Sequence, residues 1–208
     1  MFALLKQIFS RKNKDVKQRV FFTLFALFIF KLGTMIQVPG TTSITKDLGF
    51  LELMDAMGGG AFKQFSIFAL GVTPYISASI VTQLLQMDII PYFSDLAKQG
   101  PSGRMKINKI NRYLAIILAF LQGYIFSLAF IPSGSGALEY MRIAVILTAG
   151  TAFVLWLSDQ ITQKGIGNGV SLIIMAGIVM TTPTMFVDAF REMVVTQSAQ
   201  SLILGIVS

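Results

Sequence analysis

Few side chains in this 208-residue chain could carry out chemistry, because it contains no His and no Cys. This excludes a thiol nucleophile, a His general base, a disulfide framework and a Cys/His zinc site. Of the carboxylates, Asp88, Asp159 and Asp188 fall at the ends of apolar stretches, where they do not face one another. A carboxylate pair of an intramembrane protease is therefore poorly supported, and we expect no catalytic residue, no metal and no cofactor.

The run Gly165-Ile166-Gly167-Asn168-Gly169 is the one glycine-rich motif that invites a ligand. It departs from the dinucleotide fingerprint, since its third Gly comes one position early and no strand precedes it, and no Walker motif occurs elsewhere. Nucleotide binding is unsupported. Glycines at these positions instead predict a tight reversal and a close approach of backbones.

The composition indicates that the helices of this chain are surrounded by lipid and not by water. Hydrophobic residues make up 54% and charged residues 13%, where a soluble domain has about 25% charged residues. A membrane-crossing helix needs about 20 apolar residues. We expect an all-α, polytopic membrane helical bundle with five complete transmembrane helices, at about 20–38, 58–87, 113–132, 141–159 and 170–187, which lie within a unit 20–190. Residues 191–208 would hold a connection and the start of a sixth helix near Leu202.

The basic residues sort by membrane side. Most of the 17 Lys and Arg residues precede the first span or lie between the second and third spans, so the positive-inside rule places the N-terminus in the cytoplasm. This sorting by membrane side explains the net charge of +7 better than nucleic-acid binding does. A ribosome stays open as a polyanionic partner. Residues 1–19 read as a basic N-terminus. Its first 12 residues suit a surface helix with one apolar face, and the alternative is a frayed tail; the apolar residues are Phe2, Leu5, Ile8 and Phe9.

The second span carries the most information. Residues 60–87 would make a helix of about 42 Å, longer than the roughly 30 Å membrane core, and Gly71 and Pro74 interrupt it. We expect two half-helices, 61–70 and 74–87, after a hinge at 58–60, and an internal cavity beside them because broken helices at membrane depth line protein or water. The polar residues of the second half would line this cavity or, alternatively, join neighbouring helices: Ser77, Ser79, Thr82 and Gln83.

Lys31 is the one charge expected near the middle of a span, because other charges within the stated ranges lie close to the span ends. A lone ammonium at membrane depth is costly unless it reaches water or a partner. A functional role and structural anchoring are both open.

Several strings together resemble the SecY family of protein-conducting channels. Residues 65–80 (FSIFALGVTPYISASI) and 83–85 (QLL) are similar to the family's plug and second helix. Residues 156–162 (WLSDQIT), 164–169 (KGIGNG) and 175–179 (MAGIV) resemble its fourth loop and fifth helix. Residues 103–107 with 111–113 resemble the family's cytoplasmic loop before the third helix, and residues 31–33 with 39–40 resemble the end of its first helix. The similarity covers essentially the whole chain.

The resemblance implies the first half of a ten-helix, inverted-repeat channel in a bacterial cytoplasmic membrane. Such a channel is the central pore subunit of the general secretory translocon, a passive conduit that is not an enzyme. It passes unfolded polypeptides across the membrane and releases membrane helices into it. The implied partners are small membrane subunits similar to SecE and SecG, the motor ATPase SecA, the ribosome, a translocating polypeptide or signal peptide, the missing C-terminal half of the channel, and the lipid bilayer.

The resemblance also assigns roles to residues. The hydrophobic pore ring would be formed by Val72, Ile76, Val170 and Ile174, and each pair has the i, i+4 spacing of one helix face; the alternative is four ordinary core aliphatics. The plug would comprise Gly58, Gly59, Gly60, Ala61, Phe62, Lys63, Gln64, Phe65, Ser66, Ile67, Phe68 and Ala69, with its glycines giving it mobility. One side of the lateral gate would carry Pro74, Ser77, Thr82 and Gln83. Cytoplasmic partners would contact Arg104, Lys106, Lys109, Arg112 and Lys164.

Four positions depart from the family pattern. Pro101 stands where an acidic residue is usual, Met105 replaces a second basic residue, and Ser158-Asp159 replaces the commoner Gly-Glu. The first two weaken the expected electrostatic contact of the loop before the third helix.

A small-solute secondary transporter is the alternative function, since it too uses inverted repeats and broken helices. It requires ionisable groups at the membrane midplane for a saturable substrate site. The expected spans offer only Lys31.

Overall fold

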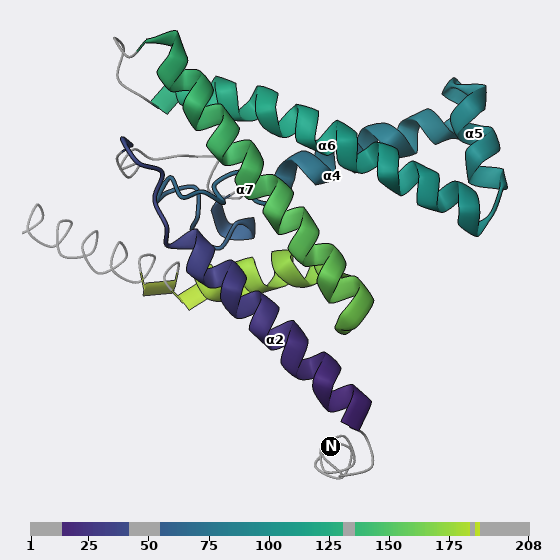
Figure 1. Ribbon diagram of the computed structural model, residues 1–208, viewed down its shortest axis with the longest axis horizontal. Coiled ribbons are helices and arrows are strands. Elements are labelled where there is room, and N and C mark those ends of the chain that lie inside the picture. Colours follow the sequence, from purple (N-terminus) through teal and green to yellow (C-terminus); the bar gives the residue numbers. More distant parts are fainter. Residues whose placement is uncertain (1–13, 42–54, 131–135, 184–185, 188–208) are drawn as a thin grey trace, which may run out of the picture.

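The computed structural model describes residues 14–41, 55–130, 136–183 and 186–187 (Figure 1). This part of the chain is helical and contains no strand; one isolated antiparallel bridge joins Gln37 to Ser66. The expected surface helix of residues 1–12 and the expected sixth helix near Leu202 lie outside the described residues.

Helices follow one another along the described part of the chain. They are α2 (Lys14–Thr34), α4 (Thr73–Leu84), which continues as the π-helical turn η1 (Leu85–Ile89), α5 (Pro91–Lys98), α6 (Pro101–Phe130) and α7 (Ala137–Lys164). A further apolar helix, Gly169–Pro183, follows α7, and we call it the 169–183 helix.

Two helices of the described part are long and apolar enough to cross a membrane, Pro101–Ala129 and Ala137–Lys164. The 169–183 helix is apolar but shorter. α2 has 21 residues and carries basic side chains at both of its ends, Lys14 at the first position and Lys31 in the last turn. The all-helical fold agrees with the expected class, while the number of complete crossings stays a prediction.

The helices extend further than the charge-free spans that predicted them. α6 begins at Pro101, twelve residues before the expected Tyr113, so the basic segment expected to be a loop is its first three turns. Pro fits the first turn of a helix because its missing N–H needs no partner there. Lys and Arg are good helix formers, so a helix continues beyond the apolar stretch that crosses lipid. α2 and α7 extend into polar sequence in the same way.

The expected half-helix at 61–70 is wrong. Residues 58–72 form a series of turns, and only the second half-helix exists, as α4 and η1. The backbone is left-handed at Gly59, Gly60 and Gly71 and also at Phe65, where φ is +46°. A helix cannot continue through residues with these angles. We call residues 58–69 the plug segment.

The plug segment lies at the centre of the described structure, enclosed by α2, α6, α7 and the 169–183 helix (Figure 1). α6 packs along α7 and along α4. The α6–α7 contact is close because Gly123 has no side chain, and a Cβ there would lie 3.3 Å from the carbonyl oxygen of Ala144. Ala115 of α6 and Ala78 of α4 are both fully buried in a further cluster. Small residues at helix contacts are typical of membrane bundles.

Candidate functional site

The four residues assigned to the pore ring lie in one apolar cluster. Val72 is buried in it, and Ile76, Val170 and Ile174 pack against it while remaining partly exposed. The cluster also includes Ala61 and Phe68 of the plug segment. The structure thus brings the two i, i+4 pairs together from separate elements.

Local structure at the start of α4 explains how Val72 and Ile76 come to face the same way. Val72 is the N-cap of α4, and its carbonyl accepts a hydrogen bond from the Ile76 N–H at 3.1 Å. Pro74 follows within the first turn, where it favours the beginning of a helix. The break expected at Gly71 and Pro74 is therefore the junction between the plug segment and α4.

The first part of the plug segment is folded around the buried Asp55, whose side chain and backbone lie just before it. One carboxylate oxygen, Oδ1, accepts the backbone N–H groups of Phe62 at 2.9 Å and Lys63 at 2.8 Å. The carbonyl of Asp55 accepts the Gly60 N–H at 2.9 Å. These bonds satisfy donors in a turn that has no helical partners.

The second part of the plug segment is joined to the chain that follows α2. The Val38 N–H donates to the Phe65 carbonyl at 3.0 Å, and the Ile67 N–H donates to the Ile36 carbonyl at 2.9 Å. This is the antiparallel bridge of Gln37 and Ser66. It fixes the register of residues 65–67 against residues 36–38, which follow α2.

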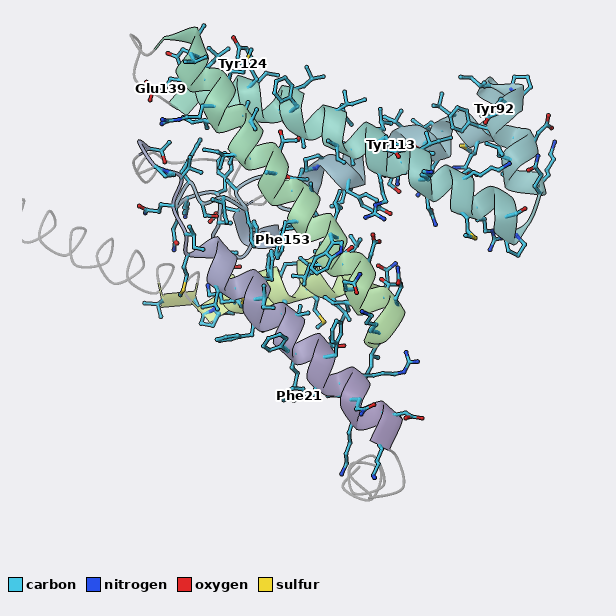
Figure 2. All side chains as sticks on the ribbon, in the orientation of Figure 1. Phe21, Tyr92, Tyr113, Tyr124, Glu139 and Phe153 are labelled. Carbon is cyan, nitrogen blue, oxygen red and sulfur yellow. The ribbon has the colours of Figure 1, made fainter. Side chains whose placement is uncertain are left out.

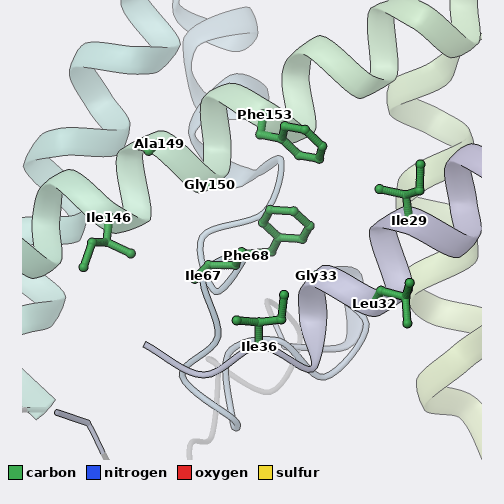
Figure 3. A pocket seen from close by; sticks show the side chains of 10 residues that line it. All are labelled: Ile29, Leu32, Gly33, Ile36, Ile67, Phe68, Ile146, Ala149, Gly150 and Phe153. Atoms are coloured by element: carbon green, nitrogen blue, oxygen red, sulfur yellow. The ribbon is translucent and has the colours of Figure 1, made fainter. Parts of the chain in front are cut away.

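The ring of Phe68 lies between α2 and α7 (Figure 3). It stacks against Phe30 at 6.0 Å and against Phe153 at 5.8 Å. The helices approach it through two glycines: a Cβ on Gly33 would lie 1.9 Å from the ring, and one on Gly150 would lie 1.8 Å from the Ile67 carbonyl oxygen. The aromatic stack therefore depends on the absence of side chains at both positions.

An open apolar groove of about 500 Å³ runs between α2 and α7, with Ile67 and Phe68 in its lining (Figure 3). Its walls are Ile29, Leu32 and Ile36 on one side and Ile146, Ala149 and Phe153 on the other. Figure 2 shows further apolar side chains on the outside of α2, such as Phe21, which is 74% exposed. This face of the protein is suited to lipid or to an apolar helix.

The 169–183 helix touches the plug segment backbone to backbone. A Cβ on Gly177 would lie 2.4 Å from the Met57 carbonyl oxygen and 3.0 Å from the Gly59 nitrogen. The Thr181 hydroxyl donates to the Ala56 carbonyl at 3.4 Å. The plug segment therefore contacts both helices that carry ring residues.

The glycine run before the 169–183 helix forms the expected tight reversal. Gly167 has φ of +71°, and a Cβ on Gly169 would lie 1.8 Å from the Ser158 carbonyl oxygen. The Asn168 side-chain oxygen accepts the Val170 N–H at 3.0 Å, which caps the helix that carries Val170 and Ile174. Arg19 and Thr23 of α2 hold the loop through bonds to Gly165 and Ile166.

The residues assigned to the lateral gate have different surroundings. Pro74 and Thr82 are buried, Ser77 is half-buried and Gln83 is exposed. The Thr82 hydroxyl lies 3.4 Å from Oδ1 of Asn111 on α6, and both residues line a polar cavity of about 300 Å³ with Gln83 and Arg104. Thr82 therefore also joins two helices of this chain.

All five basic residues assigned to cytoplasmic partners are exposed: Arg104, Lys106, Lys109, Arg112 and Lys164. Arg112 forms an ion pair with Asp159 at 2.5 Å, so one member links α6 to α7. Lys31 is half-buried in the last turn of α2, where a cation is stabilised by the carbonyl end of the helix. That position favours the anchoring interpretation.

Sequence reasoning missed the contacts that hold the plug segment. Asp55 precedes a glycine run, and an acid before a predicted turn is a weak signal for capping. Nothing in the sequence pairs Gly33, Phe68 and Gly150, because contacts between distant residues leave no local pattern. In the sequence Asn168 stands within the glycine run, and this pattern predicts a tight reversal but not the helix cap that Asn168 forms.

Comparison with solved structures identifies the class of fold, that of protein-conducting channels. A structure described as that of a protein-conducting channel matches with a TM-score of 0.63 and 21% identity, over 80% of this chain and 37% of the other. Sec61 in a canine ribosome-channel complex from the endoplasmic reticulum matches equally well. A further match, with a TM-score of 0.60 and 21% identity, covers 80% of this chain and 36% of a SecY protein whose plug domain is described as stabilising the closed state of the channel.

The chain belongs to the SecY family. The SecY family model matches residues 66–208. Protein translocase subunit SecY of Staphylococcus carnosus is 49% identical over 199 residues, which cover 90% of this chain and 46% of the relative. The Staphylococcus epidermidis protein of the same name is 48% identical over 100% of this chain and 51% of its own length. The chain thus spans about half the length of these curated relatives.

Proposed function

We propose that this chain forms the N-terminal half of the pore of a general secretory translocon. The pore is a passive channel that passes unfolded polypeptides across the cytoplasmic membrane and releases membrane helices into it. The observation that carries this proposal is the apolar cluster that contains Val72 with Ala61 and Phe68 of the plug segment, and against which Ile76, Val170 and Ile174 pack. An aliphatic constriction excludes water and ions yet makes no fixed polar contact with a passing chain.

The proposal includes five crossings with a cytoplasmic N-terminus, which the distribution of basic residues supports. It also includes an inverted repeat that would be completed by a second half. The exposed basic residues at the start of α6 are suited to a polyanionic partner such as the ribosome or to the motor ATPase. The apolar groove between α2 and α7 is suited to lipid or to a small membrane subunit. Ser77, Thr82 and Gln83 of α4 would lie at one side of the lateral gate.

The ring is tested by Ile76→Asn combined with Ile174→Asn in the complete channel subunit. Two polar amides in the constriction would let water enter it, so we expect a resting ion conductance several-fold above that of the unsubstituted channel in planar bilayers. Ile125→Asn is the matched control, because Ile125 is 61% exposed on α6. Resting conductance that is equal in the double variant and the control would contradict the ring.

A further inference from the structure

The plug segment is held by two separate sets of contacts. Its first part, residues 58–64, is attached to Asp55 through the N–H groups of Phe62 and Lys63 and through the Gly60 N–H. Its second part is attached to α2 and α7 through the bridge of Gln37 and Ser66 and through the stacked ring of Phe68. Phe65, with its left-handed φ of +46°, lies where the two parts meet.

The two sets of contacts differ in how they can be broken. The second part is fixed by a backbone bridge and by close packing, since a Cβ on Gly33 would overlap the Phe68 ring and one on Gly150 would overlap the Ile67 carbonyl oxygen. In the first part Ala61 and Phe62 are buried in the apolar clusters, and the side chain that holds its backbone by hydrogen bonds is Asp55, a single oxygen of which accepts two of its backbone donors. Asp55 is only 5% exposed, and hydrogen bonds to a carboxylate are stronger than those between neutral groups.

We infer that Asp55 is a positioning residue that holds residues 58–64 in the closed arrangement. In this proposal, displacement of the plug breaks the bonds to the Asp55 carboxylate, while residues 65–69 stay on α2 and α7. The moving part is then the glycine-rich turn alone, and the backbone rotates near Phe65. The inference rests on the proposed function, because it assigns the mechanical role of one residue in the same channel.

Hydrogen exchange of the complete subunit in lipid nanodiscs tests the inference, and it requires no transport activity. Asp55→Ala removes the acceptor of two N–H groups, so we expect peptides covering 58–64 to exchange about tenfold faster or more. Peptides covering 65–69 should exchange at the rate of the unsubstituted protein. Asp55→Asn keeps an acceptor oxygen without the charge and should give a smaller acceleration that is confined to 58–64, because its hydrogen bonds are weaker than those of a carboxylate. This variant decides the question if the Ala variant does not fold. Asp95→Ala, at an exposed acid of α5, is the control.

Equal acceleration in 58–64 and 65–69 would show general destabilisation and would overturn the inference, as would unchanged exchange in 58–64. A second measurement is the resting ion conductance, which should rise in Asp55→Ala and stay unchanged in Asp95→Ala. If the ring variant and the unsubstituted protein never conduct, the proposed function fails, yet the exchange result still decides whether Asp55 holds residues 58–64.

Discussion

Gly150 determines how closely α7 can approach the plug segment. A methyl group at this position would overlap the Ile67 carbonyl oxygen, which is backbone and cannot turn away. We expect Gly150→Ala to lower the free energy of unfolding by about 1–3 kcal/mol, as overpacking of a filled interior does. Thermal unfolding of the purified complete subunit in detergent would measure it.

Gly136→Ala is the matched control for this prediction. Nothing lies within 4 Å of a Cβ at Gly136, which is the N-cap of α7 with φ of −65°. Its replacement should cost less than that of Gly150, at most about 1 kcal/mol, because Ala is only a poorer N-cap residue than Gly there and overlaps nothing. Equal melting temperatures for the two variants would mean that α7 does not approach the plug segment as closely as the structure has it.

At single residues, the sequence allows a prediction where a motif is continuous in the chain, and the pore-ring role of such residues stays a prediction. Val72 and Ile76 belong to one such motif and Val170 and Ile174 to another, and the structure brings the two pairs together in one cluster. The contacts made by the neighbouring plug segment could not be predicted from the sequence. Phe68 packs near Gly33 and Gly150, which come from two helices. No local spacing of residues in the sequence predicts a contact between such distant positions. Asp55 acts through backbone N–H groups, which every residue other than Pro carries.

Among the helical elements, the 169–183 helix begins where the Asn168 side chain accepts the Val170 N–H. This cap fixes the start of the element that carries Val170 and Ile174. We expect Asn168→Ala to lower the free energy of unfolding by about 1 kcal/mol, as loss of an N-cap does. Asn168→Ser supplies another capping oxygen and should recover most of the loss, measured by thermal unfolding.

The Thr162 hydroxyl accepts the Gly169 N–H at 2.8 Å and so supports the same helix start. Thr162→Ala combined with Asn168→Ala should therefore lower the free energy of unfolding by more than either change alone. Equal stability of Asn168→Ala and the unsubstituted protein would contradict the capping role.

The existence of the helical elements was easier to predict than their bounds. Charge-free stretches indicate which residues can be surrounded by lipid, and they therefore predict that helices exist in the α6 and α7 regions. They do not predict that α6 begins as early as Pro101 or that α7 continues to Lys164, because these helix ends are polar. The 61–70 half-helix was predicted because its apolar residues suit a helix. The left-handed angles at Gly59, Gly60 and Phe65 override that preference, since the segment is buried among helices and makes its hydrogen bonds with Asp55 and with residues 36–38.

The whole molecule has its four ring residues on only two elements, α4 and the 169–183 helix, and spans about half the length of its relatives. A constriction must be closed on all sides to exclude ions. We expect the 208-residue chain alone to give no single-channel conductance in planar bilayers, while the complete subunit with the Ile76 and Ile174 substitutions does. Discrete channel openings from the isolated chain would contradict a pore made of two halves.

The bridge between Gln37 and Ser66 also has a consequence for biosynthesis. Its partners are separated by fewer than 30 residues along the chain, whereas the Thr181 hydroxyl and the Ala56 carbonyl are separated by 125. Contacts between near neighbours in sequence form first, and a nascent chain emerges from its N-terminus. The second part of the plug segment can therefore settle on α2 while the ribosome is still making α6. This part of the plug segment would then be in place before the 169–183 helix, which carries Val170 and Ile174, has been synthesised.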